Sequence, residues 1–435
     1  MPTMMRTFMS QPSLSADWSG EYEEKSAQWF ELFLDLIMVA ACSNVTEKLK
    51  EDLSFHGFLY FVLLTTAYTM TWMLFTNFHA RFNEKSLLHY AYLYLLLSGL
   101  GGMVLAGEPG AAFTIGMLLA RVSILFMYIT IYVLLPKVRP NVFTDISVVA
   151  MSSLTLVISL ALPESWTMPS YILAMTFESA GRLVVGQLRT QAVIPMEIHR
   201  IPLNIDHFNE RVGCLVMVSL GEAVVSAIIN FDKPELLTTR FFFMMQLALL
   251  VLFSTAMFYF TIQPVRDFHA LRRSAVTGIV FAWLHYLLVP TLLSIGVGLK
   301  FTTAAVLVGV PLSSADVWLL FGGIAATLLV MLGLRLCHFG GRQPAPTDPE
   351  LAKRIKYAWW VVVGVSPIFP LVCAAALVAS SPDDSIDPIH ALVLAAVFNL
   401  VWILIETAMM NRLVEMGQDL PGAPQKGESV HLLHN

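Results

Sequence analysis

Long apolar segments alternate with short polar connections along almost the whole chain. A membrane-spanning helix needs about 20 mostly apolar residues to cross roughly 30 Å of hydrocarbon. By this criterion the pattern predicts twelve spanning helices. They cover residues 28–46, 55–78, 87–106, 112–135, 142–162, 171–188, 208–229, 241–262, 275–299, 317–337, 357–379 and 389–411.

Two segments fit this pattern less well than the others. The sixth predicted span contains two charged residues, Glu178 and Arg182. The apolar stretch 301–311 is too short to span a bilayer, so we expect a re-entrant or interfacial segment there.

Composition supports the same class of protein. Of 435 residues, 57% are hydrophobic and only 13% are charged, whereas an ordinary soluble domain carries about 25% charged residues. This excludes a soluble enzyme and a disordered protein. The net charge of −5 offers no basic surface for nucleic acid. The four cysteines all lie in apolar segments, so we expect no disulfide framework.

Lysine and arginine are distributed unequally between the two sides of the predicted membrane region. The connections after even-numbered spans are basic and include Arg81, Arg335 and Lys356. The opposite side holds only Lys48, Lys50, Lys233, Arg240 and Lys300. Cytoplasmic connections carry the excess of basic residues. We therefore expect a multi-pass protein of the plasma membrane with both termini in the cytoplasm.

The helices that open the two halves resemble each other. Trp-Phe-Glu at 29–31 aligns without gaps with Phe-Asn-Glu at 208–210, and Leu-Ile-Met-Val at 36–39 aligns with Leu-Val-Met-Val at 215–218. This favours an all-α protein of two parallel six-helix repeats. The predicted organisation is an N-terminal tail (1–27), a first repeat (28–190), a linker (191–206), a second repeat (207–412) and a flexible tail (413–435).

Charged residues inside the predicted spans are the most informative positions, because each costs about 2.5–3.5 kcal/mol near the bilayer centre. Glu31 and Asp35 are one helical turn apart and share a helix face. The aligned helix carries His207, Glu210 and Arg211. We expect these five residues to cluster near the cytoplasmic end of the repeat interface. The cluster is either a structural ion-pair network or a site for protons or cations.

Glu222 is the second candidate. It lies about 18 Å beyond Glu210 along the helix axis and must pair, protonate or bind something. It follows Gly221, which we expect at a close helix contact. Arg121 needs a carboxylate, for which Glu178, Glu222 and Glu31 are candidates.

The remaining residues suggest little further chemistry. Glu178 and Arg182 are spaced for an ion pair within one helix. We interpret the lone histidines His79, His89 and His285 as packing residues. His207 and Glu210 are the one weak approach to a metal-site spacing, and there is no phosphate loop or recognisable nucleophile, so we expect neither a cofactor nor an enzyme.

Three short motifs resemble the bacterial low temperature requirement protein A family. They are Glu-Leu-Phe-Leu-Asp-Leu at 31–36, His-Phe-Asn-Glu-Arg at 207–211 and Leu-Gly-Glu at 220–222. Leu34 stands where the family usually has Phe, and Ala223, which lacks a hydroxyl, stands where it usually has Ser. The resemblance covers about 29–412. It implies a multi-span membrane protein linked by name to growth in the cold, with Glu31, Asp35, His207, Glu210, Arg211, Gly221 and Glu222 as its functional positions.

Two classes of function follow from these observations. The leading hypothesis is a secondary transporter coupled to protons or small cations, with a polar path at the repeat interface. Glu222 would bind the ion near mid-membrane, and Glu31, Asp35 and Glu210, balanced by Arg211, would form a gate or relay. The alternative is a structural or sensory protein that supports growth in the cold, in which the buried charges are internal ion pairs. Membrane lipid is the expected partner, and a homo-oligomer is left open.

Overall fold

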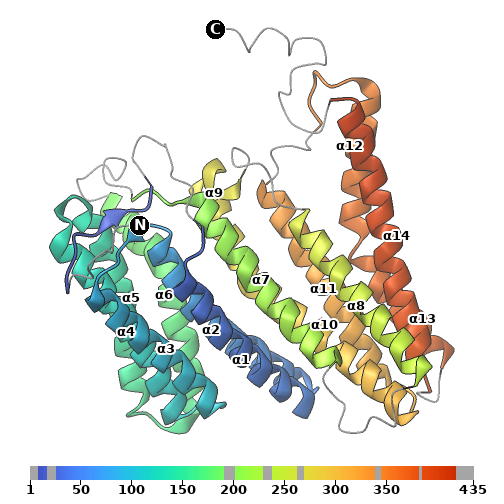
Figure 1. Cartoon of the computed structure of the whole chain (residues 1–435), viewed down its shortest axis with the longest axis horizontal. Helices are drawn as coiled ribbons and strands as arrows, with labels where there is room; N and C mark the ends of the chain where they lie inside the picture. The colour runs from blue at the N-terminus through green and yellow to red at the C-terminus, as the bar shows by residue number, and fades with distance from the viewer. Residues whose placement is uncertain are drawn as a thin grey trace, which may run out of the picture. The chain divides into compact units, whose positions relative to one another are not determined.

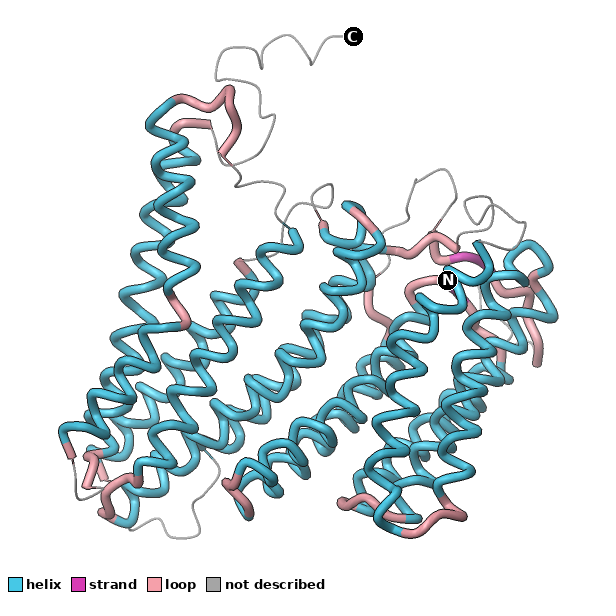
Figure 2. The backbone as a smooth tube through the Cα atoms, turned by 180° about the vertical axis from the view of Figure 1, so that it is seen from behind, coloured by secondary structure: helices cyan, strands magenta, loops and turns pink. Residues whose placement is uncertain are grey.

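The computed structural model of the chain describes residues 8–16, 26–190, 201–228, 238–261, 269–338, 344–381 and 385–417. Helices make up nearly all of this trace, with a single short pair of strands (Figure 2). The elements, labelled in Figure 1, are β1 (Ser13–Leu14), α1 (Trp29–Glu51), α2 (Phe55–His79), β2 (Phe82–Asn83), α3 (Leu87–Ala106), α4 (Ala111–Leu134), η1 (Pro136–Val138), α5 (Arg139–Ser159), η2 (Glu164–Trp166), α6 (Thr167–Thr190), α7 (Ile205–Ile228), α8 (Thr239–Phe260), α9 (Ala270–Arg273), α10 (Ala275–Val308), α11 (Ser314–His338), α12 (Glu350–Val365), α13 (Ile368–Ser380) and α14 (Pro388–Glu415).

The chain is an all-α, polytopic membrane protein, as predicted. Within the described ranges, ten helices are long and apolar enough to cross a membrane, or eleven if α12 and α13 together form one span. The sixth predicted span forms α6, which is not among these helices. The count of twelve spans stays a prediction.

Two predicted segments differ in detail from the structure. Residues 301–308 form no separate re-entrant piece, because α10 continues through them and ends at Gly309, whose φ of 74° closes the helix. The eleventh predicted span is broken into α12 and α13, which are bent by 42°. Pro367 stands at this break, where its ring removes a backbone N–H and prevents a continuous helix.

The chain divides into two compact units, Met1–Val218 and Ser219–Asn435, with the division inside α7. The predicted linker 191–206 lies largely outside the described residues, as does the C-terminal tail after residue 417. The two-repeat organisation stays a prediction.

The first unit is built from helices that pack against their neighbours in sequence: α1 against α2, and α3, α4, α5 and α6 in succession. The backbones of α3 and α4 approach each other closely. A Cβ added at Gly99 would lie 2.6 Å from the Ala120 nitrogen, and one at Gly116 would lie 2.7 Å from the Gly99 oxygen. Only residues without a side chain allow two backbones this near.

The N-terminal segment belongs to the first unit. β1 pairs antiparallel with β2, which lies between α2 and α3. Ser15 donates its N–H to the Arg81 carbonyl at 2.8 Å, and Asn204 donates its side-chain amide to the Ser15 carbonyl at 3.3 Å. Part of the predicted tail is therefore bound to the ends of the helices.

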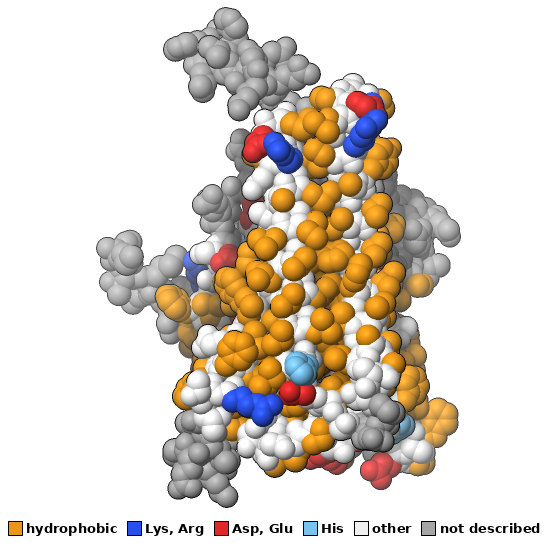
Figure 3. Space-filling model, turned by 90° about the vertical axis from the view of Figure 1, so that its right-hand side faces the viewer, with side chains coloured by type: hydrophobic (Ala, Val, Ile, Leu, Met, Phe, Trp, Pro, Cys, Tyr) orange, Lys and Arg blue, Asp and Glu red, His pale blue; other side chains and the backbone are white. Residues whose placement is uncertain are grey.

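In the second unit α10 packs along α11, and α8 packs against α14. Hydrophobic side chains cover the outer face formed by α12, α13 and α14, and charged side chains gather at its two ends (Figure 3). Exposed apolar residues on these helices include Val361, Val372, Val401 and Leu404. This distribution is the one expected of a face in contact with hydrocarbon.

Candidate functional site in the first unit

Glu31 is the centre of a buried polar cluster. It occupies the third position of α1, where its Oε2 accepts the Gln28 N–H at 2.7 Å and caps the helix. Its Oε1 faces two imidazoles: His207 Nε2 at 3.1 Å and His79 Nδ1 at 3.3 Å. Only 1% of Glu31 is exposed. One oxygen thus stabilises the helix, and the other is held among titratable groups.

Asp35, one turn further along α1, forms a separate ion pair with Arg211 of α7. Arg211 donates Nη1–H to Asp35 Oδ2 at 2.7 Å and Nη2–H to Oδ1 at 2.8 Å. Trp72 of α2 donates its indole N–H to the same carboxylate at 2.7 Å, and its ring lies 5.1 Å from the guanidinium carbon. A bidentate, charge-assisted pair of this kind fixes both side chains in one geometry.

The structure brings together four of the five residues predicted to cluster here. Glu210 is the exception, because it is exposed and accepts a hydrogen bond from the Ala27 N–H at 3.2 Å. His207 and Arg211, four residues apart, share the face of α7 that meets α1, whereas Glu210 projects about 100° away from Arg211.

The permanently charged side chains described in the cluster do not balance, because there are two carboxylates and one guanidinium. Among the described residues, two carboxylates (Glu31 and Asp35) face one guanidinium (Arg211), and the other neighbours of Glu31 are the neutral-or-charged imidazoles of His79 and His207. An uncompensated negative charge is expensive in a buried site. A proton on Glu31 or on one of the two imidazoles, or a small cation beside them, would balance it.

His79 also contacts a further histidine, His89. The sequence-based interpretation of both histidines as packing residues missed this contact. The Nε2 atom of His79 lies 3.1 Å from Nε2 of His89 on α3. His89 Nδ1 lies 3.6 Å from Glu84 Oε2, and Ser86 donates its hydroxyl to Glu84 Oε1 at 2.9 Å. Burial raises the pKa of the Glu84 carboxyl, although the Ser86 hydrogen bond opposes it. His79 is the last residue of α2 and His89 lies in the first turn of α3. Because only a short connection separates these two helix ends, the sequence could have predicted that the two histidines are near each other.

A second buried ion pair lies near the middle of α4 and α6. Arg121 donates Nε–H to Glu178 Oε1 at 2.9 Å and Nη2–H to Oε2 at 3.1 Å. Thr71 accepts from Arg121, and Ser152 donates to Glu178. Of the three candidate partners for Arg121, the structure therefore selects Glu178. The side chain of Arg182, predicted to pair with Glu178, lies outside the described residues.

Buried polar groups in the second unit

Glu222 belongs to the second unit, on the later part of α7. It is 2% exposed and accepts a hydrogen bond from the Ser226 hydroxyl at 3.2 Å. A Cβ added at Gly221 would meet nothing within 4 Å among the described residues, so the helix contact there stays a prediction. A close approach between α7 and α10 occurs at the next-but-one residue, Ala223. A Cβ added at Gly296 of α10 would lie 2.7 Å from the Ala223 Cα.

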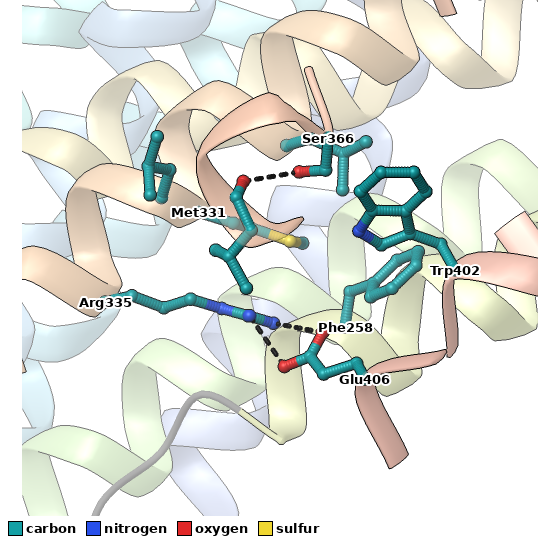
Figure 4. A pocket seen from close by; sticks show the side chains of 9 residues that line it. Phe258, Met331, Arg335, Ser366, Trp402 and Glu406 are labelled. Carbon is teal, nitrogen blue, oxygen red and sulfur yellow. Dashed lines mark hydrogen bonds and ion pairs between the residues drawn. The ribbon is translucent and has the colours of Figure 1, made fainter. Parts of the chain in front are cut away.

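The second unit contains a third buried ion pair beside a small cavity (Figure 4). Arg335 of α11 donates Nη1–H and Nη2–H to the two carboxylate oxygens of Glu406 of α14, at 2.6 and 3.1 Å. The predicted position of Arg335 in a basic connection between spans is wrong, because the residue lies in the interior. The cavity, which Ser366 and Trp402 also line, has room for about one water molecule, at about 10 Å³. The Trp402 indole N–H points toward it and has no hydrogen-bond partner among the described residues.

No group of three or more His, Cys, Asp and Glu that could hold a metal ion occurs in the described part of the chain. The fold and these sites define a polytopic helical membrane protein whose buried charges are mostly arranged as ion pairs.

The chain belongs to the bacterial low temperature requirement A protein (LtrA) family, whose sequence profile matches residues 26–414. This confirms the family resemblance carried by the three motifs. No curated protein and no solved structure matches the chain at comparable significance.

Proposed function

We propose that this protein is a secondary transporter coupled to protons or small cations, with Glu31 as an ion-exchanging residue. The observation that carries this proposal is the unbalanced charge of the first-unit cluster: Arg211 already neutralises Asp35 in a bidentate pair, and Glu31 lies between two imidazoles. A buried carboxylate in this setting can change its charge without breaking the Asp35–Arg211 pair.

The buried charges of the first unit also lie at successive depths. Glu31 is in the first turn of α1, Asp35 is one turn deeper, and the Arg121–Glu178 pair lies near the middle of α4 and α6. Thr71, which contacts Arg121, is adjacent in α2 to Trp72, which contacts Asp35. This order supports a polar path from one end of the helices toward their middle.

Glu222 supplies a further carboxylate on the same helix as His207 and Arg211. Eleven residues separate it from Arg211, which corresponds to roughly 16 Å along α7. We propose that Glu222 is a second ion- or substrate-binding position, and that the path lies where the two predicted repeats meet, because α1 and α7 open them. Glu210 would act only at the rim of this path.

Flux measurements test this proposal. Purified protein is reconstituted into liposomes that contain a pH-sensitive dye, and a panel of amino acids, sugars and organic ions is added under imposed proton or sodium gradients. We expect at least one solute class to drive or follow ion movement in the unchanged protein and not in Glu31→Gln. Absence of flux with every solute and gradient, in protein shown to be folded, contradicts the proposal.

A structural or sensory role in the cold is the second candidate. It is favoured by Arg121–Glu178 and Arg335–Glu406, each of which pairs one positive with one negative charge. This alternative predicts that Glu31→Gln changes only thermal stability in detergent, and that membranes lacking the protein differ in order or composition rather than in solute uptake. In neither candidate do we propose covalent chemistry. Membrane lipid is the proposed surrounding partner, and assembly of several copies is compatible with both.

A further inference from the structure

The histidines around Glu31 form a continuous series of titratable groups. It runs from Glu84, through His89 and His79, to Glu31, with contacts of 3.6, 3.1 and 3.3 Å between successive groups. We call these four residues the imidazole path. Each of its members is at most 4% exposed. Glu84 lies in the connection between α2 and α3, next to the exposed Lys85, and Glu31 lies in the cluster.

We propose that the coupling ion is a proton, and that the imidazole path conducts it between the membrane edge at Glu84 and the cluster at Glu31. This inference rests on the proposed function and names its ion. A metal cation such as Ca²⁺ or Mg²⁺ would need several oxygen ligands, whereas the Glu31 oxygen that does not cap α1 faces two nitrogens. Imidazole is well suited to proton transfer, because it can accept a proton on one nitrogen while releasing one from the other.

The geometry allows a balanced transfer. At the start, Glu84 is protonated, His89 carries its proton on Nε2, His79 carries its proton on Nδ1, and Glu31 is ionised. Glu84 gives its proton to His89 Nδ1, His89 gives its Nε2 proton to His79 Nε2, and His79 gives its Nδ1 proton to Glu31 Oε1. At the end Glu84 is ionised, Glu31 is protonated and both imidazoles are again neutral. One proton equivalent has moved along the path, and each donor–acceptor contact has reversed its direction.

The surroundings of each group are consistent with this starting state. Glu84 faces His89 and Ser86, and its raised pKa favours the protonated form that can donate. Glu31 faces His79 of α2 and His207 of α7, and its own backbone carbonyl accepts from Arg211 at 3.2 Å. The gap of 3.6 Å between Glu84 and His89 exceeds a direct hydrogen bond, and the 3.3 Å contact between His79 Nδ1 and Glu31 Oε1 is an ion-pair contact and not an aligned hydrogen bond. A small closing movement of the α2–α3 connection is therefore part of the transfer. The transfer also requires the His79 ring to turn toward Glu31.

Infrared spectroscopy of the full chain in lipid nanodiscs tests the path. After a rapid drop in pH, the carbonyl band of protonated Glu31 should appear, and Glu31→Gln identifies this band by removing it. In His79→Gln and His89→Gln, which keep one donor and one acceptor, its rate of appearance should fall by at least about tenfold, the contribution expected of a positioned proton-transfer group. Its final amplitude should stay the same in His89→Gln, because His89 contacts Glu84 and His79 and not Glu31.

His285→Gln is the matched control, because His285 is also fully buried but contacts Tyr259 at 3.0 Å in the second unit. It should leave the rate unchanged. Glu84→Gln provides a third path variant that keeps the shape of the connection. Protonation of Glu31 at the original rate in any one of the three path variants overturns the inference.

The outcome separates the path from the transporter proposal. Solute flux that is lost in Glu31→Gln, together with an unchanged rate in His89→Gln, overturns the path and leaves the transporter standing. A slowed rate in His89→Gln without any solute flux supports the path and contradicts the transporter.

Discussion

Arg211 binds Asp35 through two hydrogen bonds of 2.7 and 2.8 Å and leaves the Glu31 carboxylate, one turn earlier on the same helix, to two imidazoles. Two acidic residues that look equivalent in the sequence therefore have different surroundings. Asp35 is neutralised by a fixed charge, and Glu31 is surrounded by groups that can gain or lose protons.

Removing one partner of the Asp35–Arg211 pair should strongly destabilise the protein. Asp35→Asn leaves a buried guanidinium without its carboxylate, which typically costs about 3–5 kcal/mol. Thermal unfolding in detergent should show a large drop in melting temperature, and Asp35→Asn/Arg211→Gln should recover part of it. The exposed pair Arg412–Glu415 is the control, and Arg412→Gln should cost less than about 1 kcal/mol.

Glu31 and Glu178 should respond oppositely to the same substitution. Glu178→Gln removes the charge that balances buried Arg121 and should lower the free energy of unfolding by about 3–5 kcal/mol. Glu31→Gln keeps a side chain able to cap α1, so it should change stability by less than about 1 kcal/mol and abolish flux. Equal losses of stability in both variants would show that the two sites do not differ in this way.

Helix packing makes a prediction that is independent of function. Gly99→Ala would place a methyl group 2.6 Å from the Ala120 backbone nitrogen, forcing α3 and α4 apart, and overpacking of this kind costs about 1–3 kcal/mol. Gly101 lies two residues away on α3, where a Cβ meets nothing within 4 Å. Gly101→Ala should therefore be neutral or stabilising by up to about 1 kcal/mol. Thermal unfolding of the two variants, measured side by side, gives the comparison.

Stability should fall in acid because of His269, which precedes α9. Burial, aided by His285, lowers the pKa of His269 to about 4. Its Nδ1 accepts the Leu271 N–H at 3.3 Å, and its ring lies 4.7 Å from that of His338, whose Nδ1 accepts the Ala270 N–H at 3.1 Å. Both rings therefore have a nitrogen that must stay unprotonated.

The unfolded chain binds this proton at a pKa of about 6.5. The contribution of His269 is thus complete above about pH 6.5 and is lost as the pH falls toward 4. Unfolding temperatures measured between these limits should fall for the unchanged protein and fall less steeply for His269→Gln. The exposed His390 provides the comparison, and His390→Gln should follow the unchanged protein.

Much of this fold is predictable because the bilayer imposes a length and a polarity on each span. The pairing of α1 with α7 also follows from spacing, since Glu31 and Asp35 share one face, as do His207 and Arg211. The direction of Glu210 could not be predicted, because the alignment with Glu31 gives its position along the axis and not the side on which it projects. The break between α12 and α13 was predictable, because a proline, Pro367, stands within the apolar segment at that point.

Other contacts carry no local signal. Trp72 joins Asp35 from the interior of α2, where one tryptophan among many apolar residues is unremarkable in sequence. Arg335 reads as a basic residue at a helix end until Glu406 of α14, 71 residues later, is placed beside it. Such pairs depend on tertiary packing, which periodicity does not encode.

The strand β1 has a consequence for assembly of the chain. Its partner, β2, is synthesised only after α1 and α2. Ser13 and Leu14 therefore stay unpaired until α1 and α2 are inserted and β2 is on the same side of the bilayer as β1. Ser13 and Leu14 then pair with Asn83 and Phe82, which immediately precede Glu84 in the α2–α3 connection. A shortened protein that begins after residue 16 should insert normally but leave the α2–α3 connection accessible to proteases. Limited proteolysis of this connection therefore measures whether β1 has paired with β2.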